Sequence, residues 1–379
     1  MAKAVQSIIP VLKRGSVLLL ADDAGPEKRF YLICSAHDVT ADRISFMVNH
    51  GRGVICAGVS EARIKELGLP PMSTRKQSAG VEFTVSVEAR SGVTTGISAA
   101  DRAVTLQTLA NSRDARFDLV TPGHIFPMRA VSGGVLVRSD IAEAAVDLMT
   151  LAGLPPVAAI CQCLDQNGDF LREDAAAALA HEQKISTIKV TDVIRYRLAS
   201  ETIVEKIAEA SLPTTAAGNF HAVCFLSKTD RAEHLALVKG DLNEMDETGK
   251  QRPLLVRVQA EHRMGDLLGL DDSLGLSRIR DALKAIDERG RGVFVYVRHP
   301  RKGILADQIR QLSLGKPPMT AARELREYGI GAQILRALNV TRIELLTNST
   351  TEITGVEAFN LEIVGRSAFQ RSSDQEAAR

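Results

Sequence analysis

Short apolar runs alternate with amphipathic stretches along the first two hundred residues, a rhythm typical of strands and helices packed in layers. The runs SVLLLADD, YLICSAHDV, EFTVSVEAR and VAAICQCL predict strands, and SAADRAVTLQTLAN and AEAAVDLMTLAG predict helices. The second of these helices ends at a glycine followed by Leu-Pro-Pro, an ordinary helix stop. This part of the chain is therefore predicted to form a layered α/β or α+β domain.

A second alternation of elements follows the segment SLPTTAAGNF, whose small and turn-forming residues indicate a domain boundary near residue 210. Strands are predicted in HAVCFLSKT, HLALVKGDL, RPLLVRVQAE, GVFVYVRHP and RIELLTN, and helices in SRIRDALKAIDERG and AARELREYGIGAQILRAL. A length of 379 residues suits two cores. We expect a first domain over residues 1–208, a second over 209–370 and a disordered tail over 371–379.

The composition is that of a folded globular protein, with 45% apolar and 25% charged residues. Lys plus Arg (47) nearly cancel Asp plus Glu (46), so no overall field attracts nucleic acid or an anionic membrane. The chain has no apolar run of the ~18 residues that a membrane span needs. Its N-terminus, MAKAVQSIIPVLKRG, lacks a signal-peptide cleavage pattern. We therefore expect a cytoplasmic protein without nucleic-acid or membrane partners.

The cysteines are scattered and lie mostly inside apolar runs, at Cys34, Cys56, Cys161, Cys163 and Cys224. Buried, reduced thiols are the expected state. Cys161 and Cys163 form a C-x-C pair that could hold a metal, but no second cluster of Cys or His with ligand spacing lies nearby in the sequence. A core role is favoured for both.

Several strings resemble two known families in a fixed order. HGRGVICAGVSEARIKELGLPPM, FTVSVEARSGVTTGISAADRAVT and TPGHIFPMRAVSGGVLVRS resemble 3,4-dihydroxy-2-butanone 4-phosphate synthase, which converts ribulose 5-phosphate to a four-carbon phosphate and formate. EHLALVKGDL, LREYGIGAQIL and RALNVTRIELLTN resemble GTP cyclohydrolase II, which opens the purine ring of GTP. Together they resemble the bifunctional riboflavin-biosynthesis proteins over nearly the whole chain. The resemblance implies an α/β (α+β) fold of two layered domains, synthase-like and then cyclohydrolase II-like, and a homodimer.

The synthase-like half departs from that family at its acidic and metal-binding positions. The family's metal-holding Glu survives as Glu27, but the family's metal-holding His is Ile141 here and its proton-shuttling Glu is Gln162. An isoleucine offers no lone pair to a hard cation, and a glutamine cannot exchange a proton near neutral pH. Further departures are Pro26, Arg29 and Tyr31 in the acidic loop and Asp140 beside Ile141. The resemblance therefore implies that the magnesium site is lost.

Other positions keep the residue that the synthase family has. They are Arg52, Thr94, Thr95, Asp101, His124, Arg129 and Arg138. Arginine and threonine suit a phosphate or polyol ligand. Thr94, Thr95 and His124 suit ligand contact and a scaffold role equally, whereas a scaffold role is favoured for Asp101 and Arg129. The candidate site comprises Glu27 as a surviving acid, His124 as a polar wall, and Arg52, Thr94, Thr95 and Arg138 as ligand contacts.

The second half lacks the three zinc-binding cysteines of its family. In AEHRMGDLLGLDDSLG, His262 replaces the first cysteine, and residues 272–274 cover the other two. His262, Asp271 and Asp272 could hold a metal or could simply be solvated. The catalytic Tyr falls at Leu312, the Lys after the family's Leu-Thr-Asn-Asn-Pro run is missing, and the segment SLGKPPMTAARE is roughly ten residues shorter than in the family, so one wall of the nucleotide pocket is expected to be absent. Glu324 and Arg326 stand in place of the family's Asp-x-Arg pair.

These substitutions lead us to expect a diverged homologue that has lost both standard activities, uses no metal cofactor, and binds or converts another small phosphorylated or polyol ligand. One alternative is a non-catalytic, dimeric pseudoenzyme that modulates a riboflavin-pathway paralogue. Another is retained synthase and cyclohydrolase activity in riboflavin biosynthesis. Whether the chain is an enzyme, and which ligand it takes, stays open at this stage.

Overall fold

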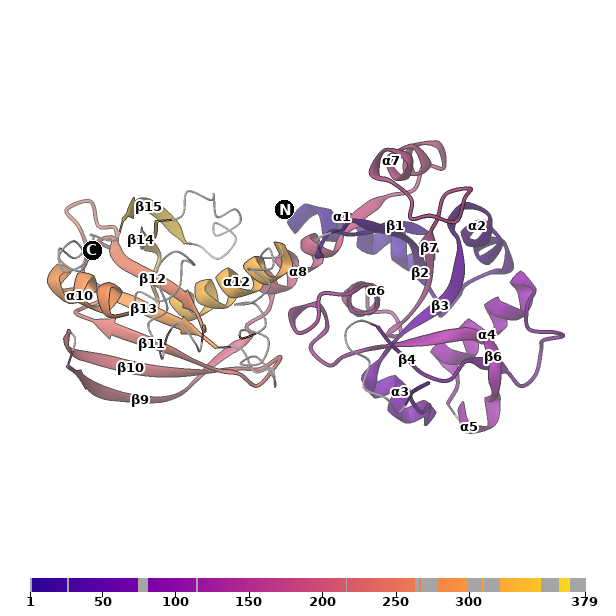
Figure 1. Ribbon diagram of the computed structural model, residues 1–379, viewed down its shortest axis with the longest axis horizontal. Coiled ribbons are helices and arrows are strands. Elements are labelled where there is room, and N and C mark those ends of the chain that lie inside the picture. Colours follow the sequence, from indigo (N-terminus) through magenta and orange to yellow (C-terminus); the bar gives the residue numbers. More distant parts are fainter. Residues whose placement is uncertain are drawn as a thin grey trace. The chain divides into compact units, whose positions relative to one another are not determined.

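The computed structural model describes residues 2–25, 27–73, 81–113, 115–215, 217–262, 266, 279–298, 309, 321–348 and 361–368. The chain divides into two compact units (Figure 1). The first comprises Met1–Arg197 with Thr320–Leu325, and the second comprises Leu198–Met319 with Arg326–Arg379. The predicted fold class, two layered domains of mixed α/β type, is confirmed. No helix in the described ranges is long and apolar enough to cross a membrane.

The first unit is built on a mixed sheet in the order β4-β6-β3-β7-β2-β1-β8, with β5 paired to β6. Its strands are β1 (Leu18–Asp22), β2 (Arg29–Ser35), β3 (Arg52–Ser60), β4 (Glu82–Phe83), β5 (Val87–Ala89), β6 (Leu119–Ala130), β7 (Val157–Cys163) and β8 (Thr187–Lys189). Its helices are α1 (Ala2–Lys13), α2 (Ala41–Gly51), α3 (Glu61–Leu67), α4 (Ala99–Asn111), α5 (Ala115–Asp118), η1 (Gly134–Leu136), α6 (Ile141–Leu151) and α7 (Glu173–Glu182). Helix α8 (Val190–Ser200) crosses the division between the units.

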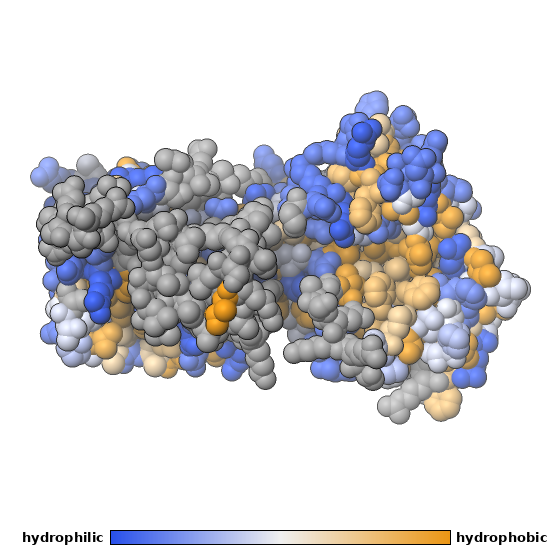
Figure 2. Space-filling view, viewed as in Figure 1, coloured by the Kyte–Doolittle hydropathy of each residue, from blue (hydrophilic) through white to orange (hydrophobic). Residues whose placement is uncertain are grey.

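Helices pack on this sheet through apolar faces. Helices α2 and α4 contact each other, and Met47 and Leu106 from them share a core with Val59 of β3. Helix α6 is buried along almost its whole length and packs against β3 and β7. On the face shown in Figure 2, apolar side chains gather over the middle of the first unit, with polar side chains around them.

The second unit has a sheet in the order β15-β14-β12-β13-β11-β10-β9. Its strands are β9 (Val204–Thr214), β10 (Gly218–Ser227), β11 (Glu233–Lys239), β12 (Leu254–Ala260), β13 (Gly292–Val297), β14 (Arg342–Leu346) and β15 (Glu362–Ser367). Strands β12, β13, β14 and β15 run parallel, and the others join antiparallel. Helix α10 (Ile279–Arg289) packs its apolar face against this sheet, and α12 (Ala321–Ala337) carries the LREYGIGAQIL segment.

The segment SLPTTAAGNF does not link two domains. It forms the end of β9, a turn and the start of β10, and the Thr214 hydroxyl donates to the Gly218 carbonyl at 2.8 Å across that turn. Its small residues serve the hairpin, where Gly218 adopts a φ of +68°. The compact units divide earlier, between Arg197 and Leu198. Residues 371–379, the expected tail, lie outside the described residues.

Candidate functional site

His124 and Glu88 form a side-chain pair across two neighbouring strands of the first unit. His124 Nδ1 lies 2.7 Å from Glu88 Oε2. The histidine side chain is 47% exposed, whereas that of Glu88 is 11% exposed. A half-exposed imidazole held by a buried carboxylate is suited to accept and release protons.

A bulge in β6 brings this histidine over β5. The β5–β6 register shifts between Val87 and Glu88, and residues 121–124 of β6 have no partner across the ladder. Gly123 fits this bend because a Cβ atom there would overlap the Val87 carbonyl, and its N–H donates to Ser86 Oγ at 3.2 Å. Bulges of this kind redirect side chains next to functional sites. The sequence TPGH therefore presents its histidine through the geometry of the bulge.

The GVTTG turn closes over the buried carboxylate. Gly96 has a φ of +81°, and a Cβ atom at that position would overlap the Glu88 carboxylate. Asp101 at the start of α4 holds the turn, accepting from Thr94 Oγ1 at 2.9 Å and from the Gly96 N–H at 3.0 Å. The Thr94 hydroxyl is thus engaged within the scaffold, whereas Thr95 lies exposed on the same turn. Sequence reasoning missed Glu88. The signal was an acidic residue inside the apolar strand FTVSVEA.

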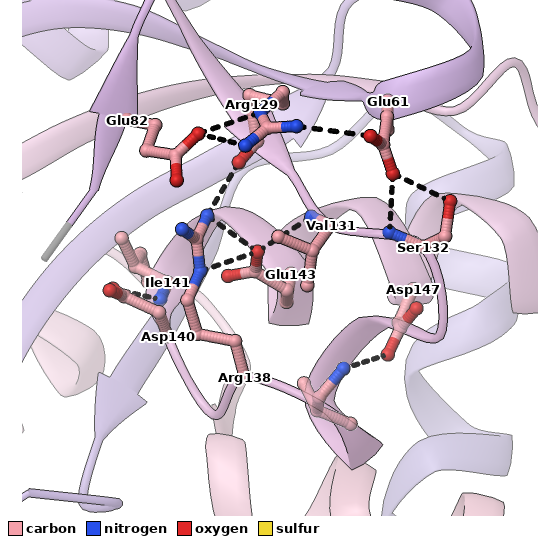
Figure 3. Close-up of polar contacts among 11 residues, drawn as sticks. Glu61, Glu82, Arg129, Val131, Ser132, Arg138, Asp140, Ile141, Glu143 and Asp147 are labelled. Atoms are coloured by element: carbon pink, nitrogen blue, oxygen red, sulfur yellow. Dashed lines mark hydrogen bonds and ion pairs between the residues drawn. The ribbon is translucent and has the colours of Figure 1, made fainter. Parts of the chain in front are cut away.

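Arg138 is committed to an internal ion pair. Its Nη2 lies 2.6 Å from Glu143 Oε1 and also donates to the Arg129 carbonyl at 2.5 Å (Figure 3). The Glu143 side chain has no solvent exposure, and the Val131 N–H also donates to it at 2.8 Å. Burial raises the pKa of Glu143 to about 7, against hydrogen bonds from Arg138 and Val131 that lower it. Arg138 lies 20% exposed and faces this carboxylate, a contact that the sequence did not suggest.

Arg129 holds a second acidic pair. Its guanidinium lies between Glu61, with Nη1 and Oε1 3.0 Å apart, and Glu82, with Nε and Oε2 2.8 Å apart (Figure 3). Ser132 Oγ donates to Glu61 at 2.8 Å, and this bond lowers the pKa of that carboxyl group. Arg129 thus links α3, β4 and β6, a contact pattern that suits the scaffold role favoured from the sequence.

The two family metal positions do not offer a matched pair of ligands. Glu27 lies in an exposed loop, where its Oε2 forms an ion pair with Arg29 Nη2 at 3.3 Å. Ile141 is 1% exposed and has no donor atom, and Asp140 caps its own helix by accepting from the Ile141 N–H at 2.7 Å. Among the described residues, no group of three or more His, Cys, Asp or Glu side chains is arranged to hold a metal ion. These residues do not fit magnesium as the family binds it.

The other substituted positions gather at the ends of β1, β2 and β7. Tyr31 and Gln162 face each other in the β2–β7 register. Asp22 ends β1, and burial raises its pKa to about 6, with the nearby charge of Asp140 adding to the rise. Burial likewise raises the pKa of Tyr31 to about 12, with Asp22 adding to it. A partly buried carboxyl group with a raised pKa thus lies at the strand ends close to the substituted Tyr31.

The remaining candidates of the first unit are Arg52 and the two cysteines of β7, and Arg52 pairs with Cys163 in the β3–β7 register. Arg52 ends α2 with a φ of +65° and donates from Nη1 to the Leu164 carbonyl at 3.1 Å. Cys161 and Cys163 are buried free thiols, and burial raises their pKa to about 11 and about 12. They therefore stay protonated, which suits a core role.

One surface pocket of about 440 Å³ lies apart from all of these residues. It is lined in part by Arg14, Arg43, Phe46 and Lys184. The Arg43 guanidinium already donates to the carbonyls of Asp38 and Arg14. The chemical groups of the candidate site are found at the strand ends and at the β6 bulge, not in this pocket.

In the second unit, polar residues follow the carboxyl ends of the parallel strands β12 and β13, the usual place for a site in such a sheet. The His262 N–H donates to Asp266 Oδ2 at 2.7 Å, and the Tyr296 hydroxyl donates to the same oxygen at 2.6 Å. Burial raises the pKa of Tyr296, and Asp266 adds to the rise. Arg298 lies 3.6 Å from the buried Glu261. His262 thus joins this small polar cluster through its backbone N–H.

Several residues singled out in the second half cannot be placed. Asp271, Asp272 and Leu312 lie outside the described residues. Glu324 and Arg326 are partly buried in the first turns of α12. The six candidates of the first unit and these two residues do not share one described cluster. The structure instead joins His124 to Glu88, Arg138 to Glu143, and Thr94 to Asp101.

Comparison with known families matches both halves. Residues 6–196 match the sequence model of 3,4-dihydroxy-2-butanone 4-phosphate synthase, and residues 205–368 match that of GTP cyclohydrolase II. The chain is 38% identical over 371 residues to monofunctional riboflavin biosynthesis protein RIBA 2 of Arabidopsis thaliana, covering 96% of this chain and 76% of that protein. It is 38% identical over 383 residues to riboflavin biosynthesis protein RibBA of Bacillus cytotoxicus, covering 98% and 94%.

A solved structure matches the chain over almost its full length. It is RibBX, a two-domain 3,4-dihydroxy-2-butanone 4-phosphate synthase from A. baumannii, with a TM-score of 0.81, 31% identity, and coverage of 97% of this chain and 99% of that one. The expectation that the chain has lost both standard activities and serves another ligand is wrong on this comparison, because relatives at this identity are named as riboflavin-biosynthesis proteins. The chain belongs to the family in which a 3,4-dihydroxy-2-butanone 4-phosphate synthase domain is followed by a GTP cyclohydrolase II domain.

Proposed function

We propose that this chain works in riboflavin biosynthesis and that its first domain catalyses the 3,4-dihydroxy-2-butanone 4-phosphate synthase reaction. The observation that carries the proposal is the likeness to proteins of that pathway over 96–98% of the chain at 38% identity. The two-domain RibBX, named for the synthase alone, supports assigning the chemistry to the first domain.

The polar groups of the first unit suit that reaction. A rearrangement of a ketose phosphate needs a group that removes and returns protons next to a carbonyl carbon. His124 is such a group, because its ring is half exposed while Glu88 holds one of its nitrogens. The exposed Thr95 and Arg52 are the candidates for the phosphate or the polyol hydroxyls. Gln162 cannot take over the family's proton transfer, so we assign that transfer to His124.

We propose that the reaction needs no metal ion, because Glu27 and Ile141 do not supply a matched pair of ligands. Activity that is unchanged after exhaustive chelation supports it, and activity that is restored only by added magnesium contradicts it.

The role of the second domain is inferred from its family alone. The relatives named RibBA support a role for it in the same pathway, and the chain has no cysteine after Cys224. A zinc site of the family's three-cysteine kind therefore cannot form. Beside His262, the structure describes a polar contact in which Asp266 accepts from the His262 backbone N–H and from the Tyr296 hydroxyl. Incubation of the purified chain with GTP, with and without zinc, tests directly whether this domain opens the purine ring.

We also propose that the chain acts in the cytoplasm as a homodimer, as the resemblance to both families implies. Light scattering coupled to size exclusion measures the mass in solution. A mass of about twice 40.9 kDa supports the homodimer, and a mass of one chain contradicts it.

Genetic complementation tests the pathway assignment. We expect the wild-type chain to restore growth without added riboflavin in a bacterial strain that lacks 3,4-dihydroxy-2-butanone 4-phosphate synthase. The variant His124→Ala should not restore growth. Failure of the wild-type chain, when it is expressed in soluble form at a level similar to a working synthase, would rule out the proposed function.

A further inference from the structure

We infer that Glu88 is a positioning residue that fixes the tautomer of His124 and leaves Nε2 as its proton-accepting nitrogen. The catalytic meaning of this inference rests on the proposed function. The tautomer itself does not, because it can be measured on the protein without substrate.

The contact between the two side chains selects one tautomer. His124 Nδ1 lies 2.7 Å from Glu88 Oε2, and an ionised carboxylate can only accept a hydrogen bond. Nδ1 must therefore carry the proton, so the lone pair of the neutral ring is on Nε2. A neutral histidine side chain in water favours the opposite tautomer, with the proton on Nε2. The tautomer expected for His124, with the proton on Nδ1, therefore differs from that of a freely solvated histidine and can be measured.

Glu88 is held for this contact on both sides. It stands on β5, where the register shift places it beneath the bulge that carries His124. Gly96 approaches it from the GVTTG turn so closely that a Cβ atom there would overlap the carboxylate. Asp101 fixes that turn through the Gly96 N–H at 3.0 Å and through Thr94 Oγ1 at 2.9 Å. The carboxylate therefore has little freedom to leave the ring.

A purely structural role does not explain the pair. Glu88 Oε1 is buried without a hydrogen-bond partner among the described residues, and burying such an oxygen costs stability. The His124 side chain is 47% exposed, so water could satisfy its ring without the glutamate. The fold thus gains little from the pair, whereas a histidine that must keep one nitrogen free for a proton gains its orientation and tautomer.

Nitrogen-15 NMR of the imidazole rings, at a pH of about 9 where an ordinary histidine is neutral, tests the inference directly. We expect His124, identified by the signal missing from His124→Ala, to show Nδ1 protonated and Nε2 unprotonated. In Glu88→Gln we expect a mixture of tautomers or a majority protonated on Nε2. A wild-type ring protonated mainly on Nε2, or the same tautomer in both proteins, would overturn the inference.

The kinetics of ribulose 5-phosphate turnover provide a second test of the inference. We expect kcat of Glu88→Gln to fall by about 10²-fold or more with KM little changed, and Glu88→Asp, which keeps the charge, to recover part of the loss. Because Glu88 acts through His124, Glu88→Gln should cost nothing further in a His124→Ala background. Equal losses by Glu88→Gln in both backgrounds would overturn the inference. A wild-type chain without turnover would instead reject the proposed function and leave the NMR result to decide the tautomer.

Discussion

Glu143 is a buried residue whose carboxyl group titrates in the neutral pH range. Its side chain has no solvent exposure, and burial raises its pKa to about 7 from an ordinary value of 4.5. A carboxyl group with a raised pKa favours the folded state when protonated. Its contribution is therefore fully present below a pH of about 4.5 and is lost as the pH rises through about 7.

Replacement of Glu143 by Gln should remove this part of the pH dependence of stability. We expect the free energy of unfolding of the wild-type protein, relative to that of Glu143→Gln, to fall between pH values of about 4.5 and 7. The fall should be on the order of 3 kcal/mol, at roughly 1.4 kcal/mol for each pKa unit. Urea unfolding of both proteins across this range measures it. Parallel pH profiles would show that Glu143 does not titrate differently in the folded chain.

Arg138 compensates the negative charge of ionised Glu143, so its removal would leave that buried charge without a cationic partner. At a pH of about 8, where Glu143 is ionised, Arg138→Ala should lower the free energy of unfolding by about 3 kcal/mol, because it leaves a buried carboxylate without its guanidinium partner. The control Arg172→Ala removes an arginine that is 86% exposed and should cost less than about 0.5 kcal/mol. If Arg138 bound the substrate phosphate instead, its removal would raise KM and leave stability nearly unchanged.

At the scale of elements, the bulge in β6 is the feature that brings His124 into contact with Glu88 of β5. Gly123 is the position where the bulge allows no side chain, since a Cβ atom would overlap the Val87 carbonyl. We expect Gly123→Ala to lower the free energy of unfolding by about 1–3 kcal/mol, the usual cost of overpacking, and to move His124 away from Glu88. Unfolding experiments and the NMR signal of His124 measure the two effects.

Gly25→Ala is the matched control, because a Cβ atom at that glycine meets nothing within 4 Å. It should leave both stability and the His124 signal unchanged. A Gly123→Ala protein with normal stability and an unshifted His124 signal would mean that the bulge does not place the histidine.

Elements were easier to predict than the contacts between them. The helix SAADRAVTLQTLAN begins at Ser98, whose side chain accepts from the Asp101 N–H, so its start could be inferred from the sequence. The hairpin of β9 and β10 could not, because small and turn-forming residues serve a hairpin turn and a domain linker equally well. The ion pair of Arg138 with Glu143 depends on the path of the chain between η1 and α6, and no local sequence pattern predicts that path.

For the whole molecule, the order of the motifs identified both families, because each motif reports a turn or a strand that the fold requires. The same comparison of motifs led to the wrong expectation about function, since it counted replaced residues one by one. Glu88 was missed because its partner His124 lies 36 residues away and meets it only across the bulge.

The release of formate from ribulose 5-phosphate by the purified full-length chain tests the central claim most directly. We predict formate and a four-carbon phosphate in equal amounts, measured by proton and phosphorus NMR, and a rate reduced by about 10²-fold or more in His124→Ala. The absence of formate from the folded wild-type protein, both with and without added magnesium, would contradict it.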